Sequence, residues 1–510
     1  MSLTTTRVGK GRARGQDTEQ PTSANPQGRE RWPWLPFVDL SLAAALVPGF
    51  FLGGLLATAA RNGSPWLAAY PALAQAHGHA QLAGWGGAMI LGVALQFLPR
   101  LRGSQLARPG WVRPLFGVFA GGLALRVAGQ VLAALVLATA DPAAGSARTA
   151  AAAETVGHGL SLVAVVGVAA FALGAVLEAA AGTGLVLLLG LSLRSGPPLT
   201  TKKAFAQVAP LLAIAFASFV TALIAWAAGA VATALAVATA GAASGAVGAA
   251  TGGRLPVIPP AFDRLAVEIA LFGFIVGISL AMSARVFSLF FRVRPANPQL
   301  VRWTGLLLGT GILAGTVAGA VHAATGVRPP VLAGAADLLW GAALWTGTAA
   351  VHVFSRRLAF PGDRGRYAWW RDPAGAGAVA AYGWATLAGL ILVLRGLWEW
   401  GIPVGPASAS VDAAIHATGA GFMTLLILAV APTMLPGFGG GRLRGPAWVW
   451  ASVVLGCLAA TLRSAPAIAP MLGMSAAGWG AGAMALGGVT GLLAVGALTV
   501  ALRRSWRGRP

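Results

Sequence analysis

The chain alternates long apolar stretches with short polar connections, and each apolar stretch is long enough to cross a lipid bilayer. A hydrocarbon core about 30 Å thick is spanned by roughly 20 helical residues. Gly- and Ala-rich segment 229–253 is expected to extend the fifth stretch and end in a loose loop. The twelve predicted spans lie near 38–60, 77–98, 112–139, 156–181 (with a continuation to 194 as the alternative), 204–228, 262–290, 301–323, 331–355, 376–398, 411–434, 447–465 and 477–502.

The basic residues fix an expected orientation for these spans. Arg100, Arg102, Arg108 and Arg113 follow the second span, and a similar enrichment recurs after every later even-numbered span. Loops on the cytoplasmic side of a membrane collect Lys and Arg. The pattern therefore predicts a multi-pass protein of the cell (cytoplasmic) membrane with both termini in the cytoplasm. It also accounts for the net charge of +22 without a nucleic-acid partner.

Composition agrees with a chain that lies mostly in lipid. Apolar residues make up 57% and charged residues 10%, whereas soluble domains carry about 25% charged residues. Residues 1–31 are polar and basic, and we expect a disordered cytoplasmic tail followed by one twelve-helix domain over 32–505. The run that ends at Ala57-Thr58-Ala59 resembles a signal-peptide cleavage site, but it is too long for one. Since Cys457 is the single cysteine, an intramolecular disulfide is excluded.

An internal repeat relates the second and tenth spans at a constant offset of 337 residues. Aligning 79–126 with 416–463 gives 17 identities in 48 positions, among them His79 with His416 and Arg126 with Arg463. No equally clean third copy is apparent in the middle of the chain. Twelve spans arranged as three sets of four would nevertheless satisfy the repeat.

Five of the six histidines are expected near the outer face. His77 and His79, His158 and His416 begin spans that run inward, and His322 ends one that runs outward. Intramembrane ionisable groups are costly and usually functional, although repeat ancestry with simple polar packing is the alternative. The exception, His352, is expected to be structural.

Imidazoles on facing helices can hold a haem from both sides, and the repeat favours His79 with His416 as that pair. His77 and His79 are two residues apart, so they point about 200° apart on a helix and would face different centres. His77, His158 and His322 would then remain for a second centre, for which copper or zinc is suited.

Several charged residues are candidates for supporting roles. Arg126 and Arg463 are expected to clamp haem propionates, with the alternative that Arg126 snorkels or pairs with helix carbonyls. Asp412, one turn before His416, is expected to orient that imidazole.

Two acidic residues and one amide complete these expectations. Asp337 is a second candidate for orienting an imidazole. Gln130 is expected to share the partner of Arg126. Counting helical rise from His158 places Glu178 at the inner boundary, away from any ligand position.

The motif from His77-Gly78-His79 through Gly84-Trp85 to Leu98-Pro99 resembles the NnrS family. So do His416 with the following Gly421-Phe422-Met423-Thr424, the segment Leu125–Gln130, and Arg285. The resemblance implies a polytopic haem- and copper-containing membrane protein linked to nitric oxide metabolism and tolerance of nitrosative stress. It also implies a distant similarity to the catalytic subunit of haem-copper oxidases, a pseudo-threefold bundle of twelve helices.

The oxidase ligand set is incomplete in this chain. It has three tyrosines, Tyr70, Tyr367 and Tyr382, and no adjacent pair of histidines. Whether a substrate is turned over, and with which redox partner, is therefore left open by the sequence. Two other functions stay as alternatives: a secondary transporter with a histidine-lined path, and a redox enzyme that reduces nitric oxide or oxygen.

Overall fold

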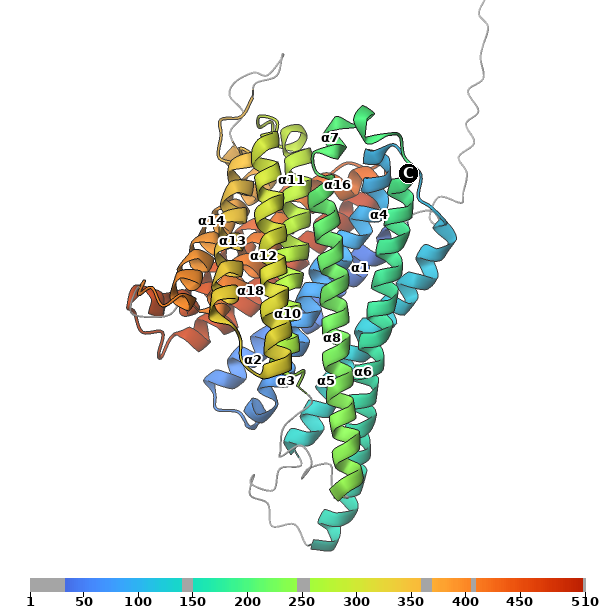
Figure 1. Ribbon diagram of the computed structural model, residues 1–510, viewed down its shortest axis with the longest axis vertical. Coiled ribbons are helices and arrows are strands. Elements are labelled where there is room, and N and C mark those ends of the chain that lie inside the picture. The colour runs from blue at the N-terminus through green and yellow to red at the C-terminus, as the bar shows by residue number, and fades with distance from the viewer. Residues whose placement is uncertain (1–32, 140–149, 245–256, 359–368, 405–409, 508–510) are drawn as a thin grey trace, which may run out of the picture. The chain divides into compact units, whose positions relative to one another are not determined.

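The computed structural model describes residues 33–139, 150–244, 257–358, 369–404 and 410–507; the predicted tail, 1–31, lies outside them. Every regular element in these ranges is helical (Figure 1). Eleven of the described helices are long and apolar enough to cross a membrane, and they coincide with eleven of the twelve predicted spans. The chain is an all-α, multi-pass membrane protein. These spans are Leu35–Arg61, Leu67–Arg102, Pro109–Val136, Leu162–Arg194, Ala209–Thr239, Pro260–Phe290, Pro298–Thr325, Pro373–Glu399, Val411–Phe438, Pro446–Leu472 and Gly480–Trp506.

The predicted eighth span is also a helix, α13 (Pro330–Ala350), of 21 residues. It contains the buried Asp337 and has a lower mean hydropathy than the eleven others. Its neighbours on both sides are long apolar helices, so protein instead of lipid covers much of its surface. The segment 229–253 behaves as expected as far as Ser244, the end of α8 (Ala209–Ser244); its remainder lies outside the described residues.

Three inner helical rods are each an α-helix that changes to a π-helix and back, as is the first rod of the chain over Leu35–Arg61. The first is α3 (Tyr70–His79), η4 (Ala80–Ala88) and α4 (Met89–Arg102). The second is α10 (Pro260–Glu268), η8 (Ile269–Ile275) and α11 (Val276–Phe290). The third is α15 (Val411–His416), η10 (Ala417–Thr424) and α16 (Leu425–Phe438). The three π segments contact one another at the centre of the bundle, and π segments are frequent at functional sites.

Outer rods surround this centre in a pattern that repeats three times. The last rod of each set of four packs on the first rod of the next: α6 on α8, α13 on α14, and α18 on α2. Within each set the third and fourth rods form a pair: α5 with α6, α12 with α13, and α17 with α18. The bundle is therefore pseudo-threefold. The outer elements are α1 (Leu35–Ala44), η2 (Ala45–Phe51), α2 (Leu52–Arg61), α5 (Val112–Thr139), α6 (Ala150–Arg194), α8, α12 (Pro298–Thr325), α13, α14 (Pro373–Glu399), α17 (Pro446–Ile468) and α18 (Gly480–Arg507).

The structure reveals the third copy of the repeat that the sequence did not. In the three inner rods the π segments begin at residues 80, 269 and 417, so offsets of 189 and 337 relate this middle copy and the last copy to the first. Glu268 then occupies the place of His79 and His416. The middle copy therefore lacks the histidine, although it keeps the change from α-helix to π-helix directly after this position.

Glycines let two pairs of helices approach closely. A Cβ on Gly129 of α5 would lie 2.6 Å from the carbonyl oxygen of Gly167 on α6, and one on Gly122 would lie 2.6 Å from the backbone nitrogen of Glu178. Gly341 of α13 and Gly389 of α14 meet in the same way, at 2.7 Å. Small residues drive helix association in membranes because they allow this backbone contact.

Helix ends follow local sequence signals. Pro260, Pro298, Pro330, Pro373 and Pro446 each occupy the first helical position, where the missing N–H costs nothing. The end of the bundle at which α3, α10 and α15 begin is called the histidine end below; α3 and α10 mark it in the lower part of Figure 1.

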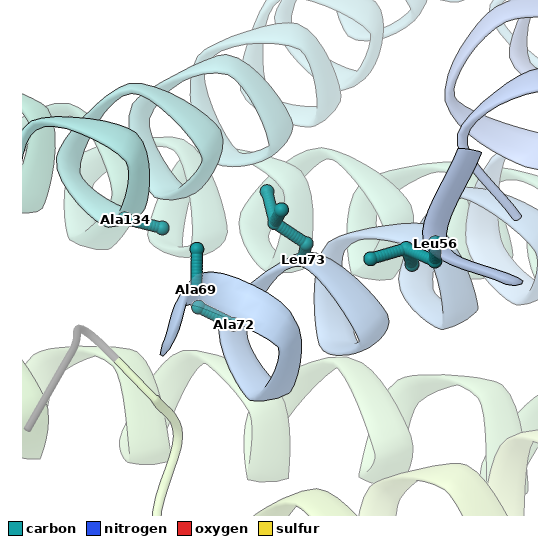
Figure 2. Close-up of a cluster of buried hydrophobic side chains, with 5 residues drawn as sticks. All are labelled: Leu56, Ala69, Ala72, Leu73 and Ala134. Carbon is teal, nitrogen blue, oxygen red and sulfur yellow. The ribbon is translucent and has the colours of Figure 1, made fainter. Parts of the chain in front are cut away.

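An apolar cluster fixes the start of α3 at the histidine end. Leu56 of α2, Ala69, Ala72 and Leu73 around the start of α3, and Ala134 of α5 pack together (Figure 2). All are at most 7% exposed. This packing fixes the first turns of the helix that carries His77 and His79.

Candidate functional site

His77 lies against the first rod of the bundle. Its Nδ1 is 2.9 Å from the carbonyl oxygen of Gly49. A Cβ on Gly53 would lie 2.7 Å from the Cε1 atom of the ring. The imidazole is thus held on one side by a hydrogen bond and on another by a glycine that leaves just enough room for it.

His416 is held by the carboxylate one turn before it. Its Nδ1 lies 3.0 Å from Oδ1 of Asp412 and 2.9 Å from the carbonyl oxygen of the same residue. Arg463 of α17 completes the group, with two bonds of 2.9 and 3.0 Å to the Asp412 carboxylate. The predicted contact between Asp412 and His416 is confirmed. Arg463 binds a protein carboxylate, a partner that the sequence did not indicate.

His77 and His416 belong to one electrostatic group. His416 and Arg463 both contribute to the electrostatic environment of the His77 ring. In both rings Nδ1 is engaged by an oxygen. Within the described residues Nε2 of each ring makes no hydrogen bond. A histidine whose other nitrogen is held by an oxygen acceptor is the usual arrangement for a metal ligand.

His79 faces the opposite side of the same helix, toward α6 and α8. Its Nε2 donates to the Glu178 carboxylate, 2.8 and 3.0 Å from the two oxygens. The ring packs edge-on against Trp226, with centroids 4.5 Å apart. Arg126 covers the face of the same tryptophan at 5.1 Å and lies 4.0 Å from Glu178. His79, Glu178 and Arg126 are at most 2% exposed.

This cluster continues toward α10 through polar side chains. The Trp226 indole donates to Asp263 at 3.3 Å. The Gln75 carboxamide accepts from the backbone nitrogen of Ile258 and from Gln130, at 2.8 and 3.1 Å. Gln130 therefore contacts Gln75. Nδ1 of His79 is buried without a hydrogen-bond partner among the described residues, and it is the nitrogen that this ring has left for a ligand.

The expected position of Glu178 was wrong. α6 runs for 45 residues to Arg194, far beyond one membrane crossing. Glu178 therefore lies near the middle of the rod instead of at its inner boundary. Gly174, one turn before it, is so close to α5 that a Cβ there would meet the backbone nitrogen of Arg126. The same contact brings Arg126 and Glu178 together.

The structure also differs from the expected pairing of His79 with His416. The repeat puts these two residues at equivalent places, each directly before a π segment. Around a threefold axis, however, equivalent residues that face away from the axis contact non-equivalent neighbours. His79 lies against Glu178, whereas His416 is held by Asp412 and interacts electrostatically with His77.

The third copy carries an ion network in place of a histidine. Glu268 binds Arg264 and Arg328, each at 3.0 Å, and lies 3.5 Å from Arg395. Asp337 binds Arg395 at 2.8 Å. Asp337 therefore pairs with an arginine, and the expectation that it orients an imidazole was wrong.

The remaining histidines are spread apart. His322 is half-buried at the end of α12. His352 has a left-handed backbone (φ 53°) just after α13, which agrees with a structural role. His158 is on α6 at a point where side chains are not described. Among side chains that are described, no three His, Cys, Asp or Glu residues form a metal-binding group. The second centre of His77, His158 and His322 stays a prediction, since it depends on His158.

No protein-family model matches the chain, and no curated protein is significantly similar to it. The resemblance to the NnrS family therefore rests on the motifs alone.

Proposed function

We propose that this chain is an integral membrane haem protein that acts in nitric oxide metabolism or in the response to nitrosative stress, as its resemblance to the NnrS family implies. The observation that carries the proposal is that His77 and His416, which lie on separate helices and interact electrostatically, each have Nδ1 held by an oxygen and Nε2 left for a ligand. Two neutral imidazoles from separate helices suit haem iron. In this proposal the termini are cytoplasmic and the histidine end faces outward.

The chain's own residues would position and neutralise such a group. Asp412 and Gly49 orient the two rings through their Nδ1 atoms. Arg463 lies beside them with a guanidinium that matches carboxylates, although in the free protein Asp412 already binds it. A haem bound there would supply an iron centre that exchanges electrons or takes up nitric oxide. Copper is the proposed second metal. Nδ1 of His79, which makes no hydrogen bond among the described residues, is the proposed ligand atom for it.

The test is an optical spectrum and a haem and metal analysis of protein purified from cells grown with ample iron and copper. His77→Ala and His416→Ala should each abolish or strongly shift the haem signal. His79→Ala should leave it in place, because that ring faces Glu178. His352→Asn is the matched control, since Asn tolerates the left-handed backbone at that position. A colourless wild-type preparation would contradict the proposal, and a loss with His79→Ala alone would contradict the pairing.

A secondary transporter is the second candidate, and one observation favours it. The His79–Glu178 pair lies near the middle of the long α6 rod, and transporters place their polar groups near the bilayer midplane. Uptake into vesicles under a pH gradient distinguishes the two functions. Coupled flux by protein without a bound cofactor would support transport over haem binding.

A further inference from the structure

A narrow, partly open cavity runs along the pseudo-threefold axis, on the side of the π segments away from the histidine end. Its volume is about 120 Å³, and its walls come from α4, α11 and α16 alone. Along α4 the walls extend from Met89, directly after η4, to Leu98. At 1.5 Å per residue the cavity is about 14 Å long, so it is thin and elongated.

The same six positions of each inner helix line this cavity. On α4 these are residues 89, 90, 93, 94, 97 and 98, and the offsets of 189 and 337 reproduce every lining residue of α11 and α16. At one level the three side chains are Ala94, Ser283 and Ala431, the smallest of the set. Three short side chains facing one axis cannot fill the space between their helices. The cavity therefore follows from the register of the repeat.

The walls select the chemistry of an occupant. All lining residues are apolar except Ser279 and Ser283. Water needs two to four polar partners to occupy a cavity, and apolar cavities of similar size stay dry yet bind benzene or xenon. Three thioethers, from Met89, Met282 and Met434, add polarizable atoms that favour dispersion contacts. A charged or strongly polar molecule would lose its hydration here without compensation.

We propose that this axial cavity binds a small, uncharged, apolar molecule of the size of a dissolved gas. The site is separate from both histidine clusters, because its walls begin beyond the π segments that follow His79 and His416. It does not rest on haem binding. The two proposals can fail independently.

Xenon is the probe, and xenon NMR of the full chain in lipid nanodiscs is the measurement. Wild type should show a saturable signal above partition into lipid. Ala94→Leu combined with Ala431→Leu places six additional carbon atoms at the level of the three short side chains and should remove the saturable signal. The matched control, Ala213→Leu with Ala217→Leu, makes the same change on an exposed face of α8 and should retain it.

A second variant keeps the test decisive if the filled protein does not fold. Val93→Ala enlarges the cavity and should raise xenon occupancy above that of wild type. The absence of a saturable signal in wild type, or equal signals in wild type, the filled variant and the enlarged variant, would overturn the proposal. The optical spectrum of each variant reports separately on haem.

Discussion

The contact between Gly53 and His77 can be tested by adding a single methyl group. In Gly53→Ala the new Cβ would lie 2.7 Å from Cε1 of His77, whereas ordinary contact begins at 3.4 Å. The ring must therefore move by about 0.7 Å, a shift comparable to overpacking a well-filled core. If it moves directly away from its acceptor, its 2.9 Å hydrogen bond to Gly49 lengthens to about 3.6 Å, which is no longer a hydrogen bond.

The neighbouring glycine provides the control. A Cβ on Gly54 would meet nothing closer than the Cα of Gly488 at 3.5 Å. Both substitutions are in the same turn of α2 and gain the same helix preference of about 0.5–1 kcal/mol. The difference between the two variants therefore isolates the clash with His77. We expect Gly53→Ala to be less stable than Gly54→Ala by about 1–3 kcal/mol.

Reversible unfolding in mixed micelles, followed by circular dichroism, measures this difference in the free energy of unfolding. Haem content and the optical spectrum, taken on the same samples, report on the ring itself. Gly53→Ala should shift the spectrum and Gly54→Ala should not. Equal stabilities, together with an unchanged spectrum for Gly53→Ala, would refute the placement of His77 against α2.

Two further predictions concern the buried cluster around Glu178. Glu178→Gln removes the buried carboxylate that binds His79 and lies 4.0 Å from Arg126, so the free energy of unfolding should fall by about 3–5 kcal/mol. Asp412→Asn, in a pair whose carboxylate is 47% exposed, should lower it by less than about 1 kcal/mol. Gly174→Ala should destabilise the protein by about 1–3 kcal/mol because α6 cannot approach α5, whereas a Cβ on Gly190 of the same helix meets nothing within 4 Å, and Gly190→Ala should be neutral or stabilising. Thermal midpoints of the four variants check both comparisons: Glu178→Gln should melt below Asp412→Asn, and Gly174→Ala should melt below Gly190→Ala.

The membrane spans were predictable because one physical quantity, apolar length, decides them. Eleven predicted spans coincide with apolar helices, and the eighth falls on α13, which carries a buried aspartate and is packed between other helices. The extent of α6 was less predictable. Its 45 residues continue past the length that a bilayer requires, so helical rise counted from one end misplaced Glu178.

The relation between the histidines could be predicted only in part. Spacing alone showed that His77 and His79 face opposite sides of a helix, and the structure places Gly49 by one and Glu178 by the other. The partner across the bundle could not be derived from spacing. It depends on how the repeats are rotated about the axis, and the sequence repeat carries no information on that rotation.

The same rotation explains how one repeated helix supports three different clusters. Each inner rod places one polar residue just before its π segment, and each of these residues has a different charged partner. His79 binds Glu178, Glu268 binds Arg328, and His416 binds Asp412 one turn before it on the same helix. A substitution at one position therefore changes one interface and leaves the equivalent two intact. On the axis, in contrast, equivalent positions contact the same cavity. A change in one copy there alters the space that all three helices share. The histidine clusters should thus respond to single substitutions, whereas the axial cavity should respond in proportion to how many of its three walls are altered.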